Sequence, residues 1–491
     1  MVTSNLAFKE KNSIEPEVVV NESPVKWCAV ALSDVVARGK RLEASVFDVE
    51  AKQARMLISK GKYPQSFIGG TDGMASSYVC GRFKRIWVEK SDMPIYQPSS
   101  IVDIKPTPDG YISAKTKTNI GNLRVKENQI LMTCSGTIGK VSFVSRTLAS
   151  KIFSHDLLRI DCRKPDEAGY IYAFLKCKIG NKILLTNSYG AVITHIEPEH
   201  LATVPIPDAP TMLKKKIHNL IVRSYELRDE SNDLIDQATA LLIGELKLPD
   251  IDAFDVGLYK KAAPVDTFSV RLSEMSGRLD ASYHVPIVDA IIEHLKRYAE
   301  EVTTVGDPRI SREVILPGRF KRVYVDEGYG RVLIGGKQLS ELDPSSKKYL
   351  STAKHDKMLK KLEVHEGTTL ITRSGTIGKI AIVPKHWEHY IPSDHIIRVI
   401  PANKDIAGYL NIFLASDYGK ALITRFTYGS VVDEIDDNHV RQIAIPLLKN
   451  HEVQKRINDL ALAANEKRYQ AYLLEQEALQ IMDSDVIYAK K

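Results

Sequence analysis

The chain has 491 residues, enough for two to four domains that each bury their own core. Its 44% hydrophobic and 26% charged residues are ordinary for a globular protein, and 68 basic against 61 acidic residues leave a net charge of +7, which permits a polyanionic partner without requiring one. No apolar run approaches the roughly 18 residues of a membrane helix and the N-terminus lacks a signal-peptide core, so we exclude a membrane protein and expect a cytoplasmic one.

We expect residues 1–25 to form a loose leader, because they are polar and show little periodicity. The cysteines that follow all lie in the first half of the chain, and they are Cys28, Cys80, Cys134, Cys162 and Cys177. Their number is odd, they include no C-x-x-C pair, and they have no counterparts in the second half. These features predict buried free thiols in a reducing compartment rather than disulfides or a zinc site.

The second half of the chain repeats landmarks of the first half in the same order. The hexapeptide Ser135–Lys140 returns letter for letter as Ser374–Lys379, 374 − 135 = 239 residues later. Four further landmarks return at this offset or at two residues less: Arg41–Ser45 as Arg278–Ser282, Gly81–Arg85 as Gly318–Arg322, Tyr189–Gly190 as Tyr428–Gly429, and Ile206–Pro207 as Ile445–Pro446. Five ordered landmarks indicate a tandem duplication, and a period this long is a whole domain rather than a solenoid unit.

Each copy begins with short strands and then turns helical. Two short apolar strands flank the hexapeptide, at 129–132 and 141–144 in the first copy and at 369–372 and 380–383 in the second. Because the intervening glycines permit positive φ, this pattern predicts a strand–loop–strand hairpin. A helix is predicted next in both copies, from residue 168 to about 186 and from 407 to about 425.

A long helix closes each copy, from residue 211 to about 246 and from 450 to about 482; the first would be roughly 50 Å long. Large residues fill one heptad lane (Leu220, Leu227, Leu234 and Leu241; Leu460, Leu474 and Ile481, interrupted by Lys467), and mostly small residues fill the other (Ile217, Ser224, Ser231 and Ala238; Ile457, Ala464, Ala471 and Ala478). These complementary lanes predict that the helices pair with each other along a close seam. The alternative is that each packs on its own domain as an ordinary amphipathic helix.

Together these patterns predict an α/β (α+β) fold of two duplicated mixed domains, at 26–209 and 268–448. The long helices, at 210–247 and 449–491, would pair as an antiparallel coiled coil and relate the domains by a pseudo-twofold axis. Residues 248–267 would be a linker, since Pro249 cannot continue the first helix.

The hexapeptide does not form a nucleotide-binding P-loop. That motif needs a glycine five positions before the Gly-Lys pair and a hydroxyl residue after it, where this chain has Cys134 and Val141, or Arg373 and Ile380. What remains is a glycine loop with hydroxyls and one lysine. Such a loop fits either contact with a DNA phosphate or a hairpin turn kept for the fold.

The Gly-Arg-Phe-Lys-Arg segments place three cations around one aromatic residue. This composition fits phosphate and base contacts in DNA, and it fits equally an exposed strand whose phenylalanine turns inward. The candidate DNA-contacting residues are therefore Arg82, Lys84, Arg85, Ser135, Thr137, Lys140 and Tyr189 in the first copy, and Arg319, Lys321, Arg322, Arg373, Ser374, Thr376, Lys379 and Tyr428 in the second.

No candidate catalytic or metal-binding group repeats between the copies. His155-Asp156 and Asp394-His395 occupy matching positions in inverted order, which favours solvated or capping roles. The methyltransferase, dinucleotide-binding and helicase motifs are absent from the sequence. A duplicated domain without duplicated catalytic residues is predicted to be a reader rather than an enzyme, with no catalytic residue, metal or cofactor of its own.

The two hexapeptides, the Tyr-Gly and Ile-Pro landmarks and the two heptad helices resemble the specificity (S) subunits of Type I restriction–modification systems, over about residues 25–485. The resemblance implies two target recognition domains that each bind half of a bipartite, asymmetric DNA target, with the helices fixing the gap. It implies double-stranded DNA, two methyltransferase (M) subunits and restriction (R) subunits as partners. S-adenosylmethionine and ATP with Mg²⁺ would be bound only by those partners.

Three alternatives stay open at this point. The leader and the generous linker leave room for a DNA-targeting subunit of a related anti-phage system. The chain could also be an enzyme, a nuclease or methyltransferase with an unrecognised site, or a scaffold built on the helices with inert globular units.

Overall fold

A computed structural model shows that helices and sheets are mixed along the chain, which confirms the predicted fold class. The structure describes residues 18–19, 27–37, 40–190, 194–254, 260–262, 265–275, 277–429 and 431–490. The leader predicted at residues 1–25 lies outside the described residues, apart from β1 (Val18–Val19). Among the described helices, none is both long and apolar enough to cross a membrane.

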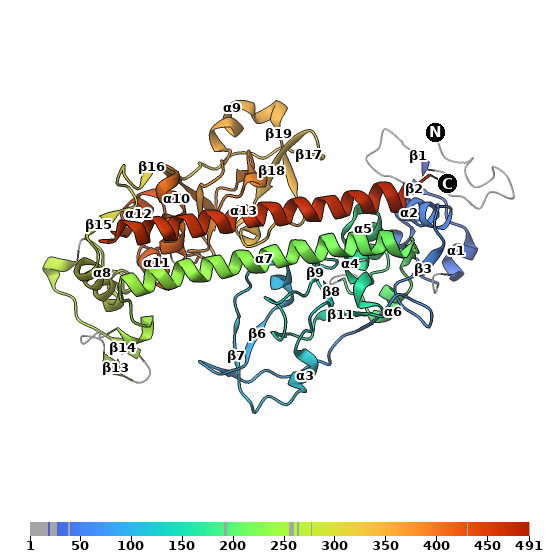
Figure 1. Ribbon diagram of the computed structural model, residues 1–491, viewed down its shortest axis with the longest axis horizontal. Helices are drawn as coiled ribbons and strands as arrows, with labels where there is room; N and C mark the ends of the chain where they lie inside the picture. The colour runs from blue at the N-terminus through green and yellow to red at the C-terminus, as the bar shows by residue number, and fades with distance from the viewer. Residues whose placement is uncertain are drawn as a thin grey trace. The chain divides into compact units, whose positions relative to one another are not determined.

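The chain forms two compact units whose boundaries fall inside the long helices. Unit 1 comprises Met1–Glu226 and Leu473–Lys491, and unit 2 comprises Leu227–Tyr472. The helix α7 (Thr211–Glu245) begins in unit 1 and ends in unit 2, whereas α13 (His451–Ile481) begins in unit 2 and ends in unit 1. Each is a single unbroken helix, drawn in green and in red in Figure 1. Each unit therefore holds the start of one long helix and the end of the other.

Unit 1 is built on two four-stranded sheets, in the orders β4-β11-β8-β9 and β10-β6-β7-β5, and a third of two strands, β12-β3. The first sheet is antiparallel, with Leu158 opposite Met132. The helices and strands of this unit are β2 (Trp27–Cys28), α1 (Leu32–Ala37), α2 (Val49–Ser59), β3 (Gln65–Phe67), β4 (Ala75–Tyr78), β5 (Trp87–Val88), β6 (Pro94–Tyr96), β7 (Gly110–Ile112), α3 (Ile120–Leu123), β8 (Ile130–Thr133), β9 (Val141–Phe143), β10 (Ile152–Phe153), β11 (Leu157–Cys162), α4 (Ala168–Lys176), α5 (Lys178–Leu185), α6 (Pro198–Ala202) and β12 (Pro205–Pro207).

Unit 2 repeats the same topology, because its sheets run β16-β23-β20-β21, β17-β19-β18-β22 and β15-β24. Its elements are β13 (Lys260–Ala262), β14 (Val265–Thr267), α8 (Pro286–Tyr298), β15 (Glu301–Thr304), β16 (Ser311–Ile315), β17 (Tyr324–Val325), β18 (Gly330–Ile334), β19 (Lys348–Ser351), α9 (Thr352–Leu362), β20 (Thr369–Thr372), β21 (Ile380–Ile382), β22 (Ile391–Pro392), β23 (Ile396–Pro401), α10 (Lys404–Ala415), α11 (Asp417–Thr424), α12 (Asp437–Arg441) and β24 (Ala444–Leu447). The shared strand order is what a duplicated domain predicts.

The stretch predicted as a linker, residues 248–267, has structure of its own where it is described. Leu248 is buried in the core of unit 2, and β13 pairs with β14 as a hairpin. Residues 255–259 and 263–264 of this stretch lie outside the described residues.

The single helix predicted after the hairpin is in fact two helices in each unit. In unit 1 the helix stops at Cys177, whose ψ of 158° is extended, and restarts as α5 with the Cys177 sulfur accepting the Gly180 N–H at 3.3 Å. Ser416 plays the same part in unit 2, where its hydroxyl accepts the Gly419 N–H at 3.1 Å. The prediction missed the break because an apolar helical pattern continues through it, and capping by a buried thiol leaves no polar signal.

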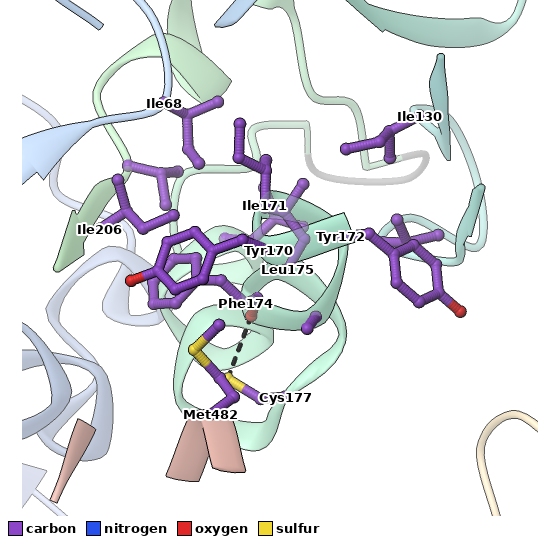
Figure 2. Packing of buried hydrophobic residues seen from close by; sticks show 14 of the residues in the cluster. Ile68, Ile130, Tyr170, Ile171, Tyr172, Phe174, Leu175, Cys177, Ile206 and Met482 are labelled. Carbon is purple, nitrogen blue, oxygen red and sulfur yellow. Dashed lines mark hydrogen bonds between the residues drawn. The ribbon is translucent and has the colours of Figure 1, made fainter. Parts of the chain in front are cut away.

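The first of these two helices lies at the centre of each unit. In unit 1 every residue from Ala168 to Leu175 is buried, and Figure 2 shows Tyr170 and Phe174 packed among Ile206 and Met482. The described cysteines Cys80, Cys134, Cys162 and Cys177 are free thiols as predicted, but only Cys134 and Cys177 are buried, whereas Cys80 and Cys162 are half-buried. Burial raises the pKa of Cys177 to about 12, so this thiol is inert at neutral pH.

The central helix of each unit docks on a long helix through a glycine. A side chain on Gly169 of α4 would meet the Cα of His218 in α7 at 2.7 Å, and the Gly169 N–H donates to His218 Nδ1 at 3.0 Å. Gly408 of α10 meets Asn458 of α13 in the same way, donating its N–H to Asn458 Oδ1 at 2.8 Å. The Gly169 N–H lies in the first turn of α4, where donors have no partner within the helix, and Asn458 serves both the Gly408 N–H and, through Nδ2, the Lys404 carbonyl at 3.1 Å.

The repeated Ile-Pro landmark belongs to the same arrangement. The Tyr170 hydroxyl donates to the Pro207 carbonyl at 2.6 Å, and the Tyr409 hydroxyl donates to the Pro446 carbonyl at 2.6 Å. Each bond ties the central helix to the strand that leads into the long helix. The landmark is therefore structural in both units.

The lane of small residues in the long helices is the more deeply buried one. Its members in α7 and α13 are all fully buried: Ile217, Ser224, Ser231 and Ala238, and Ile457, Ala464, Ala471 and Ala478. In the lane of large residues, Leu227 and Leu460 are buried, Leu220, Leu234 and Leu474 are half-buried, and Leu241 is 37% exposed. Leu242 is buried in place of Leu241, because a straight helix drifts about 20° per heptad and the buried position moves one residue onward.

Within unit 2 the two long helices contact each other directly. Lys467, the residue that interrupts the heptad lane, places its Nζ 2.5 Å from Glu230 Oε2, and Arg468 Nε donates to Ser231 Oγ at 3.3 Å. The interruption is thus occupied by an ion pair between the helices. Pairing along the full length of both helices, with a pseudo-twofold axis, stays a prediction.

The end of α13 completes the core of unit 1. Ala478, Ile481 and Met482 pack in its main hydrophobic cluster, and the buried carboxylate of Glu475 accepts from the Tyr172 hydroxyl at 2.5 Å. Lys176 Nζ lies 2.8 Å from the same carboxylate oxygen. The last residues of the chain are therefore part of the first unit.

We predict that acid weakens unit 1 through His218. Burial lowers the pKa of this imidazole, while Asp166 opposes the shift and Lys215 adds to it; the neutral ring is the form that accepts the Gly169 N–H. A histidine with a lowered pKa contributes stability above its unfolded pKa of ~6.5, and that contribution is lost as pH falls. Urea denaturation of unit 1 between about pH 7.5 and about pH 5.5 should show a loss of about 1 kcal/mol.

The matched control is His218→Asn, which installs the residue type that serves unit 2. This variant should keep the acceptor and lose the part of the pH dependence that belongs to His218. An unchanged pH profile in the variant would contradict the assignment.

Candidate functional site

The repeated hexapeptide forms the predicted strand–loop–strand hairpin in both units. In unit 1 Gly136 and Gly139 have φ of 68° and 81°, and in unit 2 Gly375 and Gly378 have φ of 73° and 78°. The threonine that ends the first strand closes the loop. The Thr133 carbonyl accepts the Gly139 N–H at 3.1 Å and its hydroxyl accepts the Lys140 N–H at 3.0 Å.

These bonds favour one of the two interpretations of the loop. Thr372 closes the second loop with the same two bonds, from Gly378 and Lys379, and the Gly136 N–H is taken by the Thr194 carbonyl at 3.1 Å. Several backbone donors of the loop are therefore used internally, and its contact with a DNA phosphate stays a prediction. The structural hairpin accounts for the repeated glycines, and the side chains at the loop tip are left for contact with a ligand.

The Tyr-Gly landmark opens a second hairpin that lies against this loop. Tyr189 and His195 exchange backbone hydrogen bonds at 2.9 and 2.7 Å, and His195 also pairs with Ser135. In unit 2 Tyr428 and Glu434 exchange the same bonds, and Glu434 pairs with Ser374. The Tyr-Gly and hexapeptide landmarks are therefore neighbours in each unit.

The first landmark, Arg41–Ser45 and its repeat, holds the start of this second hairpin. The Arg41 guanidinium pairs with Glu43 and donates to the Ser188 carbonyl at 2.7 Å, one residue before Tyr189. Arg278 pairs with Asp280 and donates to the Thr427 carbonyl at 3.3 Å, one residue before Tyr428. This landmark acts through the backbone and does not itself face a ligand.

The histidine–aspartate pairs also contact the repeated segments, which the sequence analysis did not predict. In unit 2 Asp394 forms an ion pair with Arg322, and His395 Nδ1 lies 2.6 Å from Ser374 Oγ. In unit 1 the His155 ring packs edge-on against Phe83, with ring centroids 6.0 Å apart. Inverted order had suggested solvated or capping roles. The two pairs occupy equivalent positions in the duplicated copies, and this was the sequence signal that could have identified them as candidate site residues.

The electrostatics of the two pairs differ. Burial lowers the pKa of His155; Asp156 opposes this, and the guanidiniums of Arg85 and Arg82 lower it further, so the ring is neutral beside a cationic segment. Burial also lowers the pKa of Arg322, but its contacts with Tyr324 and Asp394 outweigh burial and the pKa is raised. The last arginine of Gly-Arg-Phe-Lys-Arg thus acts on the histidine–aspartate pair in both units. In unit 2 Arg322 forms an ion pair with Asp394, and in unit 1 Arg85 lowers the pKa of His155.

The predicted DNA-contacting residues fall into three groups by exposure. Arg82, Lys84, Thr137, Arg319, Lys321, Thr376 and Tyr428 are exposed; Arg85, Ser135, Lys140, Ser374 and Lys379 are half-buried at the edge of the site; Tyr189, Arg322 and Arg373 are half-buried and engaged by other side chains. In the described part of the chain, no ion pair engages Arg82, Lys84, Arg319 or Lys321. These four cations are the surface charge that a polyanion would meet.

Arg373 and Tyr189, which are both predicted to contact DNA, have side-chain partners within their own units. Arg373 Nη2 lies 2.6 Å from Glu434 Oε2 and its Nε donates to the Ile435 carbonyl at 2.9 Å. The Tyr189 hydroxyl donates to Glu197 Oε1 at 2.5 Å. Both side chains therefore brace the Tyr-Gly hairpin, and their contact with DNA stays a prediction.

Metal-binding geometry occurs at one place in the described residues of unit 2. His365, Glu388 and His389 bring one ligand atom each within 4.8 Å of one another. As the structure stands, His365 Nδ1 lies 2.5 Å from Glu388 Oε1 and His389 Nδ1 lies 3.0 Å from Glu363 Oε2. The corresponding turn of unit 1 holds Ser150 where unit 2 has His389, so this group is not part of the duplicated site.

The Ser374–His395 contact is the nearest approach to a catalytic arrangement. In a catalytic triad a third group orients the histidine ring, whereas Asp394, the neighbour of His395, pairs with Arg322. In unit 1 the position of His395 is held by Asp156. The duplicated arrangement is therefore one of exposed cations and loop tips.

Comparison with known proteins identifies part of the chain. Residues 343–460 match the family model of the Type I restriction modification DNA specificity domain, which confirms the resemblance that the repeated landmarks predicted. This range contains the second hexapeptide, the second Tyr-Gly and Ile-Pro landmarks and the start of α13. No curated protein matches the chain.

Three solved structures are similar to it. A Type I restriction-modification S subunit from M. genitalium is 13% identical, with 86% of this chain and 94% of that chain covered at a TM-score of 0.33. The HsdS subunit from Thermoanaerobacter tengcongensis is 12% identical, with 88% and 100% covered at 0.26. A structure describing complex assembly and conformational transition of the type I R-M system is 15% identical, with 86% and 98% covered at 0.26.

We predict that the loop glycine Gly375 is required for its backbone angle alone. Its φ is 73° and no atom lies within 4 Å of an added Cβ, so Gly375→Ala introduces strain without a clash. The expected loss is about 1 kcal/mol in the free energy of unfolding of unit 2, measured by urea denaturation. Gly318→Ala is the control, because Gly318 has equal space and no positive φ. Equal losses in both variants would contradict this explanation.

Proposed function

We propose that this chain, whose second unit contains a Type I restriction modification DNA specificity domain, is the sequence-specific DNA-binding subunit of a Type I restriction–modification complex. The observation that carries the proposal is the duplicated surface. In unit 2 the last arginine of the cationic segment pairs with Asp394 and His395 contacts Ser374 of the hexapeptide, and in unit 1 Phe83 of the matching segment packs against His155, so that segments far apart in the sequence meet at matching places. Exposed arginine and lysine beside side chains of varied chemistry suit contact with phosphates and bases.

Each unit would bind one half of a bipartite target. Residues at matching positions of the two units differ, since Asp156 and His195 of unit 1 are replaced by His395 and Glu434 in unit 2. Different donors and acceptors read different base edges, so the two half-sites would differ in sequence and the target would be asymmetric. The long helices, each shared by both units, would set the separation of the half-sites.

The chain would act without catalysis of its own, and it would direct two methyltransferase subunits and the restriction subunits to the target. S-adenosylmethionine, ATP and Mg²⁺ would belong to those partners. The exposed basic residues of the long helices, such as Lys215, Lys216, Lys455 and Arg456, offer a surface for the methyltransferases.

Methylation mapping tests the proposal directly. The chain would be expressed with its neighbouring methyltransferase gene in a cell that lacks modification of its own, and methylated adenines would be located genome-wide by long-read sequencing. The expected result is one split motif, and exchange of either unit for that of another specificity subunit should change only one half of it. An assembled complex that produces no new methylation would contradict the proposal.

The four exposed cations should contribute to the affinity for DNA but not to the choice of DNA sequence. Removing one phosphate contact weakens binding uniformly and lowers the slope of log affinity against log salt by about 1. Arg82→Ala and Lys84→Ala should therefore each lower that slope by about 1 in fluorescence anisotropy titrations with duplex DNA. Lys216→Ala, an exposed cation on α7, should leave the slope unchanged, and a slope unaffected by all three would remove Arg82 and Lys84 from the interface.

A further inference from the structure

Each unit exposes one large aromatic ring at the same place beside the cationic segment. Trp87 follows Gly81–Arg85 by two residues and is 51% exposed, and Tyr324 follows Gly318–Arg322 by two residues and is 48% exposed. Both open a strand of two residues at the outer edge of a four-stranded sheet, β5 and β17. The two rings stand 237 residues apart, the offset of the segments themselves, so they are counterparts in the duplication.

The Trp87 ring is held with part of its surface free. An added Cβ on Gly110, across the sheet, would lie 3.0 Å from Trp87 Cζ3, so the ring rests on the bare backbone of that glycine. The Arg85 guanidinium lies 5.8 Å from the ring centroid, and the flanking Ile86 and Val88 are 42% and 37% exposed. A ring that is already ordered loses little entropy when a ligand packs on its free surface.

Tyr324 has cationic neighbours of the same kind. Lys348 Nζ lies 5.7 Å from its ring centroid, and Arg322, which pairs with Asp394, also contacts Tyr324. In both units the last arginine of the repeated segment therefore links the exposed ring to the histidine–aspartate pair. The two rings belong to the edge of the candidate site.

The surroundings of the rings decide what fits them. An apolar protein surface or a lipid chain would cover the rings and also bury Arg82 and Lys84, or Arg319 and Lys321, without a counter-charge, which is costly. A nucleobase presents a flat π-face and carries its own phosphate, so it matches a ring beside cations. In paired DNA the grooves present base edges, and a ring reaches a base face only by prying a base step open at a cost of about a few kcal/mol, whereas an unpaired base offers its face without that cost.

We infer that Trp87 and Tyr324 each stack on an unpaired nucleobase of DNA, one in each half of the target. The inference rests on the proposed function, because it takes DNA as the ligand. It adds that the chain binds opened DNA in preference to fully paired DNA. Trp87 and Tyr324 are positioning residues for the DNA and take no part in methyl transfer.

The test compares two fluorescein-labelled duplexes of about three helical turns. One is fully paired, and the other carries about four unpaired bases at its centre. The full chain is titrated into each and the affinities are read by fluorescence anisotropy. Stacking predicts that the opened duplex binds about tenfold more tightly. The double variant Trp87→Ala, Tyr324→Ala should remove this preference and keep the affinity for the paired duplex within about twofold.

Two controls accompany the double variant. Trp87→Phe with Tyr324→Phe keeps a π-face and should keep most of the preference, whereas Tyr488→Ala removes an aromatic side chain that is 57% exposed near the end of α13 and should change nothing. All the residues changed are largely exposed, so the variants are expected to fold.

Each remaining outcome is decisive. If the chain binds both duplexes equally, the stacking inference is overturned and the proposed function stands. If the preference exists and survives the double alanine variant, opened DNA is bound by other residues and the assignment to Trp87 and Tyr324 is overturned. If the chain binds neither duplex, the proposed function fails with it.

Discussion

The contact between a glycine of the central helix and a long helix is the constraint on which each unit depends. Gly169 and Gly408 bring α4 and α10 so close to α7 and α13 that an added Cβ would lie within 3 Å of the long helix. The N–H of each glycine is accepted by a side chain of the long helix, His218 or Asn458. Close approach and hydrogen bond are inseparable, because a larger residue would move the helix and leave the buried donor unpaired. This contact therefore fixes where α4 and α10 lie against the long helices.

The fully buried small residues of the long helices belong to the same requirement. A lane of serine and alanine lets neighbouring backbones approach, whereas leucine in that lane would keep them apart. The polar members of the lane are buried without cost to the fold where they have partners, as with Ser231 and Arg468 in unit 2. Specific geometry at these positions, more than apolar area, holds the globular parts to the long helices.

The sequence was sufficient for the features that repeat or that have a strong period. The duplication, the two long helices and the hairpin around each hexapeptide are all present, since identical letters, heptad lanes and alternation report directly on structure. The structural features that could not be predicted from the sequence depend on contacts between distant segments. The helix break at Cys177 is capped by a buried thiol, Leu241 leaves the buried side through helical drift, and Arg373 is taken by Glu434 from 61 residues away. The fully buried Arg159 and Arg398 likewise stand in otherwise apolar strands, and Arg159 is paired with backbone carbonyls of Leu123 and Phe153 that no local pattern connects to it.

Comparison of the two units distinguishes residues that support the fold from residues that could recognise a DNA sequence. The residues that are identical in both copies (the loop glycines, the closing threonines, the tyrosines bonded to Pro207 and Pro446) act through the backbone and hold the hairpins in place. The matching positions that differ (Asp156 and His395, His195 and Glu434, Trp87 and Tyr324) differ in charge, in hydrogen-bonding groups or in ring size. A surface that must bind DNA in both copies needs the first set unchanged, and a target whose halves are unlike needs the second set to vary. Under the proposed function, the identical residues would supply the frame and the phosphate-contacting cations, and the side chains that differ would give each unit its own selectivity.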